Sequence, residues 1–182
     1  MIHSFDAALF KYLNGWAGVS PGRDIAIIFF AQYLVYLCVA GFLLFLFLRY
    51  GARREKIRIF LVTALAVIIA RLGVTELIRF FYHRPRPFVV YQVHQLISEH
   101  GWSFPSGHAA FFFAMAAAIY GYDKKWGIGF FLAALAMNVS RVIAGVHYPS
   151  DIFGGAIVGI GVAYAVFYFA EKRTRKEIGK AL

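Results

Sequence analysis

Residues 140–151 read SRVIAGVHYPSD and connect the end of one apolar segment to the start of the next. This stretch contains an arginine, a histidine and an aspartate at fixed offsets. Two earlier stretches, residues 79–87 and 105–108, add further arginines, a serine and a second histidine. Guanidinium groups bind phosphate oxygens, and an imidazole held by a carboxylate can act as a nucleophile. The three stretches therefore point to a site that binds a phosphate group and breaks its ester or anhydride bond.

The composition is that of a membrane protein rather than of a soluble domain. Apolar residues make up 61% of the 182 residues, against roughly half in an average soluble domain. The net charge of +10 comes mainly from short basic runs between apolar segments, which indicates membrane topology rather than a nucleic-acid partner. Cys38 is the single cysteine, so no internal disulfide can form. No cleavable signal peptide is evident, so we expect insertion to use an internal apolar segment.

Five apolar segments have the length and composition of membrane-spanning helices, for which about 20 residues suffice. They are Ile25–Leu48, Ile57–Ile78, Phe104–Tyr122, Trp126–Val142 and the segment from Tyr148 to Ala170. Residues 4–17 form an amphipathic helix too short to cross, which either lies in the interface plane or packs on the bundle as a flap. We therefore expect an all-α, polytopic membrane bundle of five transmembrane helices plus this interfacial helix, a six-helix core formed by one domain over residues 1–182.

The basic runs predict how the bundle is oriented. Residues 49–58, 123–125 and the tail 171–182 carry most of the lysines and arginines, and five spans place all three on one side. The positive-inside rule makes that side cytoplasmic, with the tail expected to fray. The loops 79–103 and 143–150 then share the opposite side with the N-terminal helix. All three polar stretches are thus expected to meet on the outer face.

The candidate phosphate-binding residues fall into two groups. Guanidiniums stay charged at any relevant pH and grip phosphate oxygens in pairs, which selects Arg79, Arg86 and Arg141. Singly, Arg79 could be a snorkelling residue at a helix end, and Arg86 a turn residue between prolines. Ser106 and Gly107 stand where a helix begins, and its free amide groups bind anions. A plain N-cap is the alternative for the serine.

The candidate catalytic residues are His147, Asp151 and His108. Asp151 follows His147 by four residues at the start of a helix, so its carboxylate can reach the imidazole and stabilise the charge that develops there. Asp151 could instead only favour the helix N-terminus, and His108 could be an interfacial histidine with a satisfied hydrogen bond. Neither alternative explains why an arginine and a second histidine lie beside them.

The three motifs resemble the signature of the type 2 phosphatidic acid phosphatase family, integral-membrane lipid phosphatases with a six-helix bundle. The resemblance runs in order over Arg79-x6-Arg86-Pro87, Pro105-Ser106-Gly107-His108 and Ser140-Arg141-x5-His147-x3-Asp151. It implies that His147 attacks phosphorus to form a phosphohistidine, that Asp151 orients it, and that His108 protonates the leaving group and then activates water. The implied phosphate ligands are Arg79, Arg86, Ser106, Gly107 and Arg141, with no metal and no cofactor. The family usually has lysine where this chain has Arg79.

The stretch from Arg84 to Val89 is similar to bacterial undecaprenyl-diphosphate phosphatases of this family. The resemblance implies a lipid phosphate or diphosphate substrate, undecaprenyl diphosphate first, and a bacterial cytoplasmic membrane with the site facing the periplasm or exterior. Phosphatidylglycerophosphate and the 1-phosphate of lipid A are the alternative substrates. A bis-histidine haem protein or a lipid transporter is the alternative of another class. The sequence leaves the oligomeric state open.

Two further charges, Arg71 and Glu76, interrupt the second apolar segment. Residues five apart do not face each other on an α-helix, so we do not expect these two to pair. Arg71 is expected to make a polar contact between helices, for example with Asn138. Glu76 could pair with Arg79, three residues further on, and position it.

Overall fold

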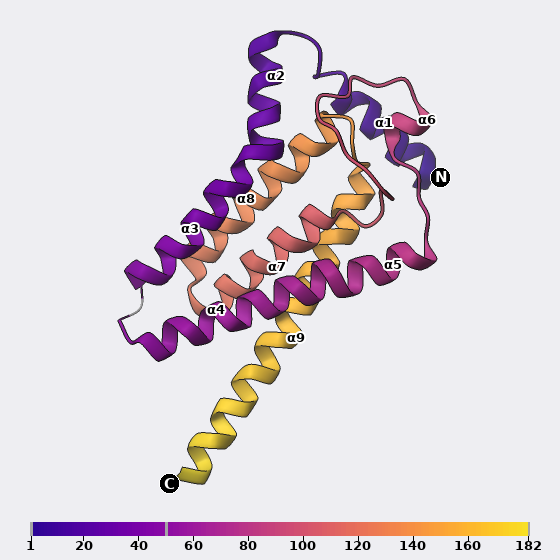
Figure 1. The fold of residues 1–182 in the computed structure, drawn as a ribbon. Helices are drawn as coiled ribbons and strands as arrows, with labels where there is room; N and C mark the ends of the chain where they lie inside the picture. Colours follow the sequence, from indigo (N-terminus) through magenta and orange to yellow (C-terminus); the bar gives the residue numbers. More distant parts are fainter. Residues whose placement is uncertain (1, 50, 182) are drawn as a thin grey trace.

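The computed structural model describes residues 2–49 and 51–181, and the side chains of residues 4–49 and 51–172. Every regular element in these ranges is a helix, and the longer ones run in two opposite directions through a single bundle (Figure 1). Two of the segments are π-helical turns, η1 and η2, each embedded in a longer α-helix. The elements are α1 (Ile2–Asn14), α2 (Pro21–Ile28), η1 (Phe29–Tyr33), α3 (Leu34–Arg49), α4 (Arg53–Ile68), η2 (Ile69–Val74), α5 (Thr75–Phe81), α6 (Pro87–Val90), α7 (Gly107–Tyr122), α8 (Lys124–Ile143) and α9 (Pro149–Ala181).

Four continuous helices in the described part of the chain are long and apolar enough to cross a membrane. They are Pro21–Arg49, Arg53–Phe81, Lys124–Ile143 and Pro149–Lys172. The remaining predicted span is α7, whose 16 residues extend only about 24 Å at 1.5 Å per residue. Most of its side chains are buried by the surrounding helices, so α7 forms the centre of the bundle.

The helix boundaries differ from the predicted ones mainly at the basic segments. The predicted loop 49–58 is short, because α4 already begins at Arg53 and its first turns carry most of the basic residues. The predicted outer loop contains the one-turn helix α6 and begins only after Phe81, where α5 ends. Helix α9 continues to Ala181, through the tail that was expected to fray. Charged residues can continue a helix wherever water solvates their side chains. Boundaries placed where the hydropathy falls therefore end the helices too early.

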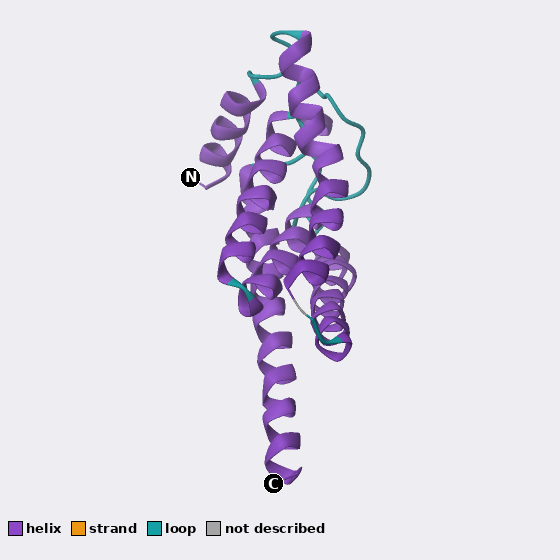
Figure 2. Cartoon of the chain, turned by 90° about the vertical axis from the view of Figure 1, so that its left-hand side faces the viewer, coloured by secondary structure: helices purple, strands orange, loops and turns teal. Residues whose placement is uncertain are grey.

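Close backbone packing joins α9 to α7, and Figure 2 shows α9 emerging from this contact as a long single helix. A Cβ atom added at Gly155 would lie 2.5 Å from the carbonyl oxygen of Ser106, and one at Gly159 would lie 2.5 Å from that of Ala110. The two glycines are four residues apart, as in the small-residue contacts that let membrane helices approach closely. This contact fixes the start of α9 against the start of α7.

The predicted N-terminal amphipathic helix is α1, and it packs on one end of the bundle. Phe10 is fully buried, and its ring meets that of Tyr148 edge-on at 5.5 Å between centroids. Figure 1 places α1 and α6 together at the end of the bundle where α8 ends, and the α3–α4 and α7–α8 connections at the opposite end. There Arg49 binds Asp123 at 2.6 Å. The predicted separation of polar stretches and basic turns is therefore present in the fold.

Candidate active site

The three polar stretches meet where α7 and α9 begin and α8 ends. The amide of Ser106 donates to the carbonyl of Asp151 at 2.9 Å, and this hydrogen bond joins the start of α7 to the start of α9. Arg86, in the outer loop, donates to the carbonyl of Val146 at 2.9 Å. Gly145 makes the turn after α8 with a φ of 85°, a value that L side chains rarely adopt. Segments far apart in sequence thus converge on one site.

His147 and Asp151 form a buried pair. The imidazole Nδ1 lies 3.3 Å from the carboxylate Oδ2, and the two side chains are 1% and 0% exposed. Burial lowers the pKa of His147 to about 4, with the nearby Arg141 and Arg86 acting in the same direction and Asp151 opposing them. The imidazole is therefore neutral at pH 7. With its Nδ1–H directed at Asp151, its Nε2 carries the free electron pair that a nucleophile needs.

A carboxylate that the sequence did not single out occupies the space between two of the predicted phosphate ligands. Glu99 accepts from Arg141 and, at 3.5 Å, from Arg86. Burial alone would raise the pKa of Glu99, but Arg141 and then Arg86 hold it below the usual range, so the group is ionised. Glu99 and Arg141 also line a cavity of about 370 Å³ together with His108 and residues of η1 and α3 (Gln32, Tyr33, Val35 and Tyr36).

Arg86 has a second task that the sequence did not reveal. Besides Val146, it donates to the carbonyls of Gly101 and His100, each at 3.0 Å, and so braces the outer loop. Its Nη1 also lies 3.4 Å from Nε2 of His147. Burial lowers the pKa of Arg86 to about 10, so the guanidinium remains charged at pH 7. Arg86 therefore lies beside the imidazole of His147, and most of its N–H groups donate to backbone carbonyls.

The PSGH stretch forms the N-terminus of α7. The Ser106 hydroxyl is buried and accepts from the amide of Ala109 at 3.4 Å, the contact of an N-cap residue. A hydroxyl that accepts in this way keeps its own proton available for another acceptor. Gly107 is the first residue of the helix, and His108 follows it into the cavity lining.

Arg79 belongs to a second cluster, with Arg71 and Glu76. It donates to the carbonyl of Pro105 at 3.0 Å and to Glu76 at 3.2 Å, the pairing considered from sequence. The prediction that Arg71 and Glu76 do not pair is wrong, because they form an ion pair. Arg71 lies in η2, and a π-helical turn closes from residue i to i+5, which brings residues five apart together. The expected partner of Arg71, Asn138, instead donates to the carbonyl of Ala134 at 2.8 Å.

Sequence reasoning also missed Arg84 and Asp6, which support the carboxylate of Asp151. Arg84 donates to Oδ1 of Asp151 at 2.8 Å and to Asp6 at 2.6 Å. The guanidinium lies over the ring of Tyr148, 4.0 Å from its centroid. Asp151 Oδ2 further accepts from the amide of Tyr148 at 2.8 Å and from the hydroxyl of Ser103. Arg84 stands next to the recognised Arg86 motif, but no sequence signal links it to a residue 78 positions away.

Among the residues whose side chains the structure describes, no three histidine, cysteine, aspartate or glutamate groups come close enough to hold a metal ion. The charged groups of the site are instead paired with one another: arginine with glutamate around the cavity, and arginine with aspartate behind His147.

The fold and the site define a class: a helical membrane protein with a carboxylate-bound histidine beside an arginine-rich anion site. Residues 57–175 match the family model of the PAP2 superfamily, and the chain belongs to that family, as a membrane lipid phosphatase.

Two curated relatives and one solved structure are similar over most of this chain. The chain is 30% identical to the undecaprenyl-diphosphatase BcrC of Bacillus subtilis (strain 168), over 90% of this chain and 83% of that protein. It is 28% identical to the bacitracin transport permease protein BcrC of Bacillus licheniformis, over 90% and 79% respectively. The crystal structure of Aquifex aeolicus LpxE superposes with a TM-score of 0.72 and 29% identity, covering 89% of this chain and 94% of that one.

Proposed function

We propose that this phosphatase hydrolyses undecaprenyl diphosphate to undecaprenyl phosphate and inorganic phosphate through a phosphohistidine at His147. The observation that carries the proposal is the neutral imidazole of His147, held by Asp151, beside an arginine pair that already holds the carboxylate of Glu99. An ionised carboxylate between two guanidiniums resembles a bound phosphate in charge and in hydrogen bonding. The substrate phosphate would take its place.

In the proposed reaction, Nε2 of His147 attacks the terminal phosphorus while the bond to the bridging oxygen breaks. His108 protonates the departing oxygen and then removes a proton from the water that cleaves the phosphohistidine. Arg141 and Arg86, Ser106 and the amide of Gly107, and Arg79 at the far side of the PSGH turn, hold the phosphoryl oxygens. Positive groups placed before the reaction stabilise the charge of the transition state without reorganisation.

The choice of substrate rests on the relatives and on the placement of the cavity. The undecaprenyl-diphosphatase of Bacillus subtilis is similar over nearly the whole chain. The cavity lies beside η1 and α3, whose outward side chains are largely exposed and apolar, as suits a substrate whose tail stays in the bilayer. Phosphatidylglycerophosphate and lipid A phosphates are the alternative substrates for the same chemistry.

The proposal includes a membrane arrangement. The chain is one domain over residues 1–182 with five crossings, α7 being the short central one, and α1 lies in the interface on the outer side. The active site faces the periplasm or exterior of a bacterial cytoplasmic membrane, and the tail 171–182 is cytoplasmic. The basic residues at the α3–α4 and α7–α8 connections support this orientation through the positive-inside rule.

Phosphate release from purified protein in nanodiscs tests the reaction. The substrates are undecaprenyl diphosphate, phosphatidylglycerophosphate, phosphatidic acid and lipid A, and we expect the first to give the highest kcat/KM. His147→Ala should lower turnover by several orders of magnitude, because the nucleophile is lost. His83→Ala, which changes an exposed histidine of the outer loop, is the matched control and should stay near wild type.

Unchanged phosphate release in His147→Ala would contradict the nucleophile assignment, and a clear preference for another lipid would contradict the substrate. Bacitracin transport, suggested by the name of one relative, is tested in proteoliposomes with the same variant. Transport that survives His147→Ala, with no phosphate release by wild type, would replace the phosphatase proposal.

A further inference from the structure

The site contains two arginine pairs, and each pair is bridged by one glutamate. Glu99 joins Arg86 and Arg141, and Glu76 joins Arg71 and Arg79. In the first pair, Arg86 contacts His147 and Arg141 lines the cavity with His108. The second pair contacts Pro105 and Gly107 of the PSGH turn. The turn that begins α7 therefore lies between two similar anion-binding arrangements, of which the mechanism above uses chiefly the first.

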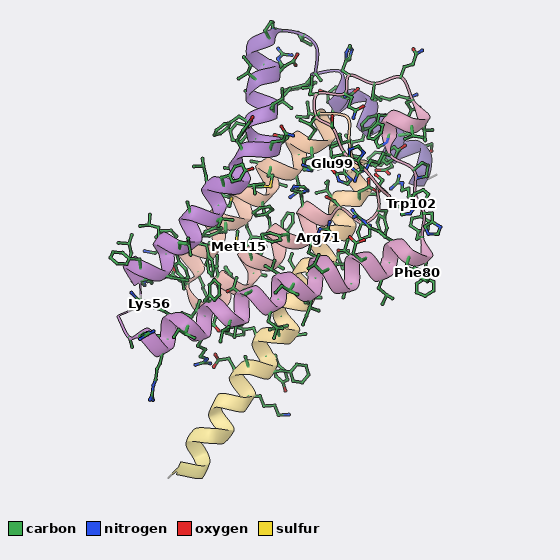
Figure 3. The ribbon with its side chains drawn as sticks, viewed as in Figure 1. Lys56, Arg71, Phe80, Glu99, Trp102 and Met115 are labelled. Atoms are coloured by element: carbon green, nitrogen blue, oxygen red, sulfur yellow. The ribbon has the colours of Figure 1, made fainter. Side chains whose placement is uncertain are left out.

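The second pair is held directly against the PSGH turn. Arg79 donates to the carbonyl of Pro105 at 3.0 Å. The guanidinium of Arg71 covers the Cα of Gly107: a Cβ atom added there would lie 2.5 Å from Nε and 2.8 Å from Cζ of Arg71. Any side chain at residue 107 would displace that guanidinium. Figure 3 labels Arg71 and Glu99 near the start of α7.

Each pair also retains one free donor. Among the residues whose side chains are described, the Nε atoms of Arg79 and Arg141 are buried and have no hydrogen-bond partner. A buried N–H without an acceptor costs about 1–3 kcal/mol, so such groups call for an occupant or another explanation. Arg79 and Arg141 belong to different pairs, so the unsatisfied donors mark two places rather than one.

The charges of the two clusters fit a diphosphate. Four guanidiniums stand against two carboxylates, which leaves two positive charges unmatched around the PSGH turn. The mechanism above uses Arg86, Arg141 and Arg79 for the transferred phosphoryl group and leaves Arg71 unassigned. A second pair inside the helix Arg53–Phe81 is costly, because ionisable groups in membrane spans are rarely kept without a function. A substrate with two linked phosphates would use both pairs.

We propose that Arg71, which Glu76 holds beside Arg79, forms a second anion subsite that binds the lipid-linked phosphate of a diphosphate substrate. The proposal rests on the proposed diphosphatase function. When the bond between the terminal phosphorus and the bridging oxygen breaks, its electron pair goes to that oxygen, which becomes a terminal oxygen of the lipid phosphate. Arg71 holds this developing charge. A lipid monophosphate leaves an alkoxide instead and relies on proton donation alone.

The test compares two substrates that share one tail and differ by one phosphate, farnesyl diphosphate and farnesyl phosphate. Arg71→Gln should lower kcat/KM for the diphosphate about tenfold to a hundredfold, the usual weight of one charge-assisted hydrogen bond, and change the monophosphate rate less than about threefold. Arg71→Lys keeps the positive charge but lacks the paired N–H donors of the guanidinium. It should lower kcat/KM for the diphosphate by an intermediate factor and leave the monophosphate rate unchanged. Arg54→Gln, an exposed arginine at the other end of the bundle, is the matched control.

Retained monophosphate activity shows that the variants fold. If Arg71→Gln does not fold, the Arg71→Lys comparison decides the same question. Equal losses on both substrates, or no loss on the diphosphate, would overturn the subsite while leaving the proposed function in place. Absence of diphosphate hydrolysis by wild type would instead overturn the proposed function. Competition with a farnesyl methylenebisphosphonate and a farnesyl monophosphonate gives a second readout, in which only the bisphosphonate should bind more weakly to Arg71→Gln.

Discussion

Single residues of this site are buried in the charge state that their chemistry needs. The imidazole of His147 is neutral because burial and two arginines oppose its protonation, although Asp151 favours it. Glu99 is ionised for the opposite reason, since Arg141 and Arg86 outweigh its burial. The arrangement keeps the proposed nucleophile unprotonated while the proposed phosphate ligands beside it remain positive. Both states depend on neighbours from other segments of the chain.

The pKa of His147 predicts how stability depends on pH. Its folded-state value of about 4 lies below the ordinary 6.5, so the unfolded chain binds a proton that the folded protein does not. The stabilisation is complete above pH 6.5 and is lost as the pH falls toward 4, by up to about 3 kcal/mol at about 1.4 kcal/mol per pH unit. Thermal unfolding in detergent from pH 7 to pH 4 measures this loss.

The comparison with His147→Gln isolates the contribution of the imidazole to that profile. The variant has no titrating group at this position, so its melting temperature should fall less steeply between pH 6.5 and 4. The same slope in both proteins would show that His147 is not protonated on unfolding in this range. His83→Gln, which alters an exposed ring, serves as the control.

Among the elements, α1 contributes more to the site than a surface helix would. Asp6 accepts from Arg84 at 2.6 Å and from the amide of Ser150 at 2.9 Å, at the start of α9. Two turns further along α1, Asn14 donates to the carbonyls of His94 and Ile143, both at 2.9 Å. One face of α1 thus holds both the outer loop and the helix ends that carry His147 and Asp151.

Asp6→Asn tests whether α1 positions the carboxylate of Asp151. The change removes one of the two carboxylates that hold Arg84, so Arg84 and Asp151 should shift relative to His147. We expect kcat to fall about tenfold to a hundredfold with little change in KM, because small displacements at a reacting group are costly and the phosphate ligands are untouched. Steady-state kinetics of phosphate release measure the two constants.

Recovery of kcat in Asp6→Glu would support a positioning role, since that variant restores the charge. Asp24→Asn, which changes an aspartate that accepts from the amide of Gly18 at 2.9 Å, is the matched control. A rise in KM with unchanged kcat would instead place Asp6 in substrate binding. The buried ion pair also predicts a loss of stability of about 3–5 kcal/mol when one partner is removed.

At the scale of the molecule, the order of the helices and the meeting of the three motifs could be predicted from sequence. Apolar length identifies long helices, and the even number of crossings between the outer loop and residues 143–150, α7 and α8, brings the polar stretches to one end. The role of Glu99 could not be predicted, because the loop that carries it has no periodicity. The Arg71–Glu76 pair also escaped prediction, because a π-helical turn leaves no pattern in apolar spacing. Asp6 and Arg84 meet only through the packing of α1.

The proposed orientation predicts which positions water-soluble reagents reach from outside the cell. In a Cys38→Ser background, Ser98→Cys lies in the exposed outer loop, and Lys124→Cys lies at the first residue of α8, next to the α7–α8 connection. A membrane-impermeant maleimide should label the first in intact cells and the second only after permeabilisation. Replacing Cys38 removes the only native thiol of the sequence, so that labelling reports the introduced cysteine alone. Labelling in the reverse order would overturn the orientation and place the site in the cytoplasm.

The π-helical turn η2 determines in which direction around the helix axis the side chains of α5 point, since α5 continues the same helix Arg53–Phe81. Each residue of an α-helix advances the side chains by about 100°, so shortening this turn by one residue would swing α5 around its axis by roughly that angle. Arg79 would then point away from Pro105, and Arg71 would lose Glu76. The chain therefore tolerates substitutions in Ile69–Val74 better than a change in its length, and a shortened homologue would need another way to bring a cation to the same turn.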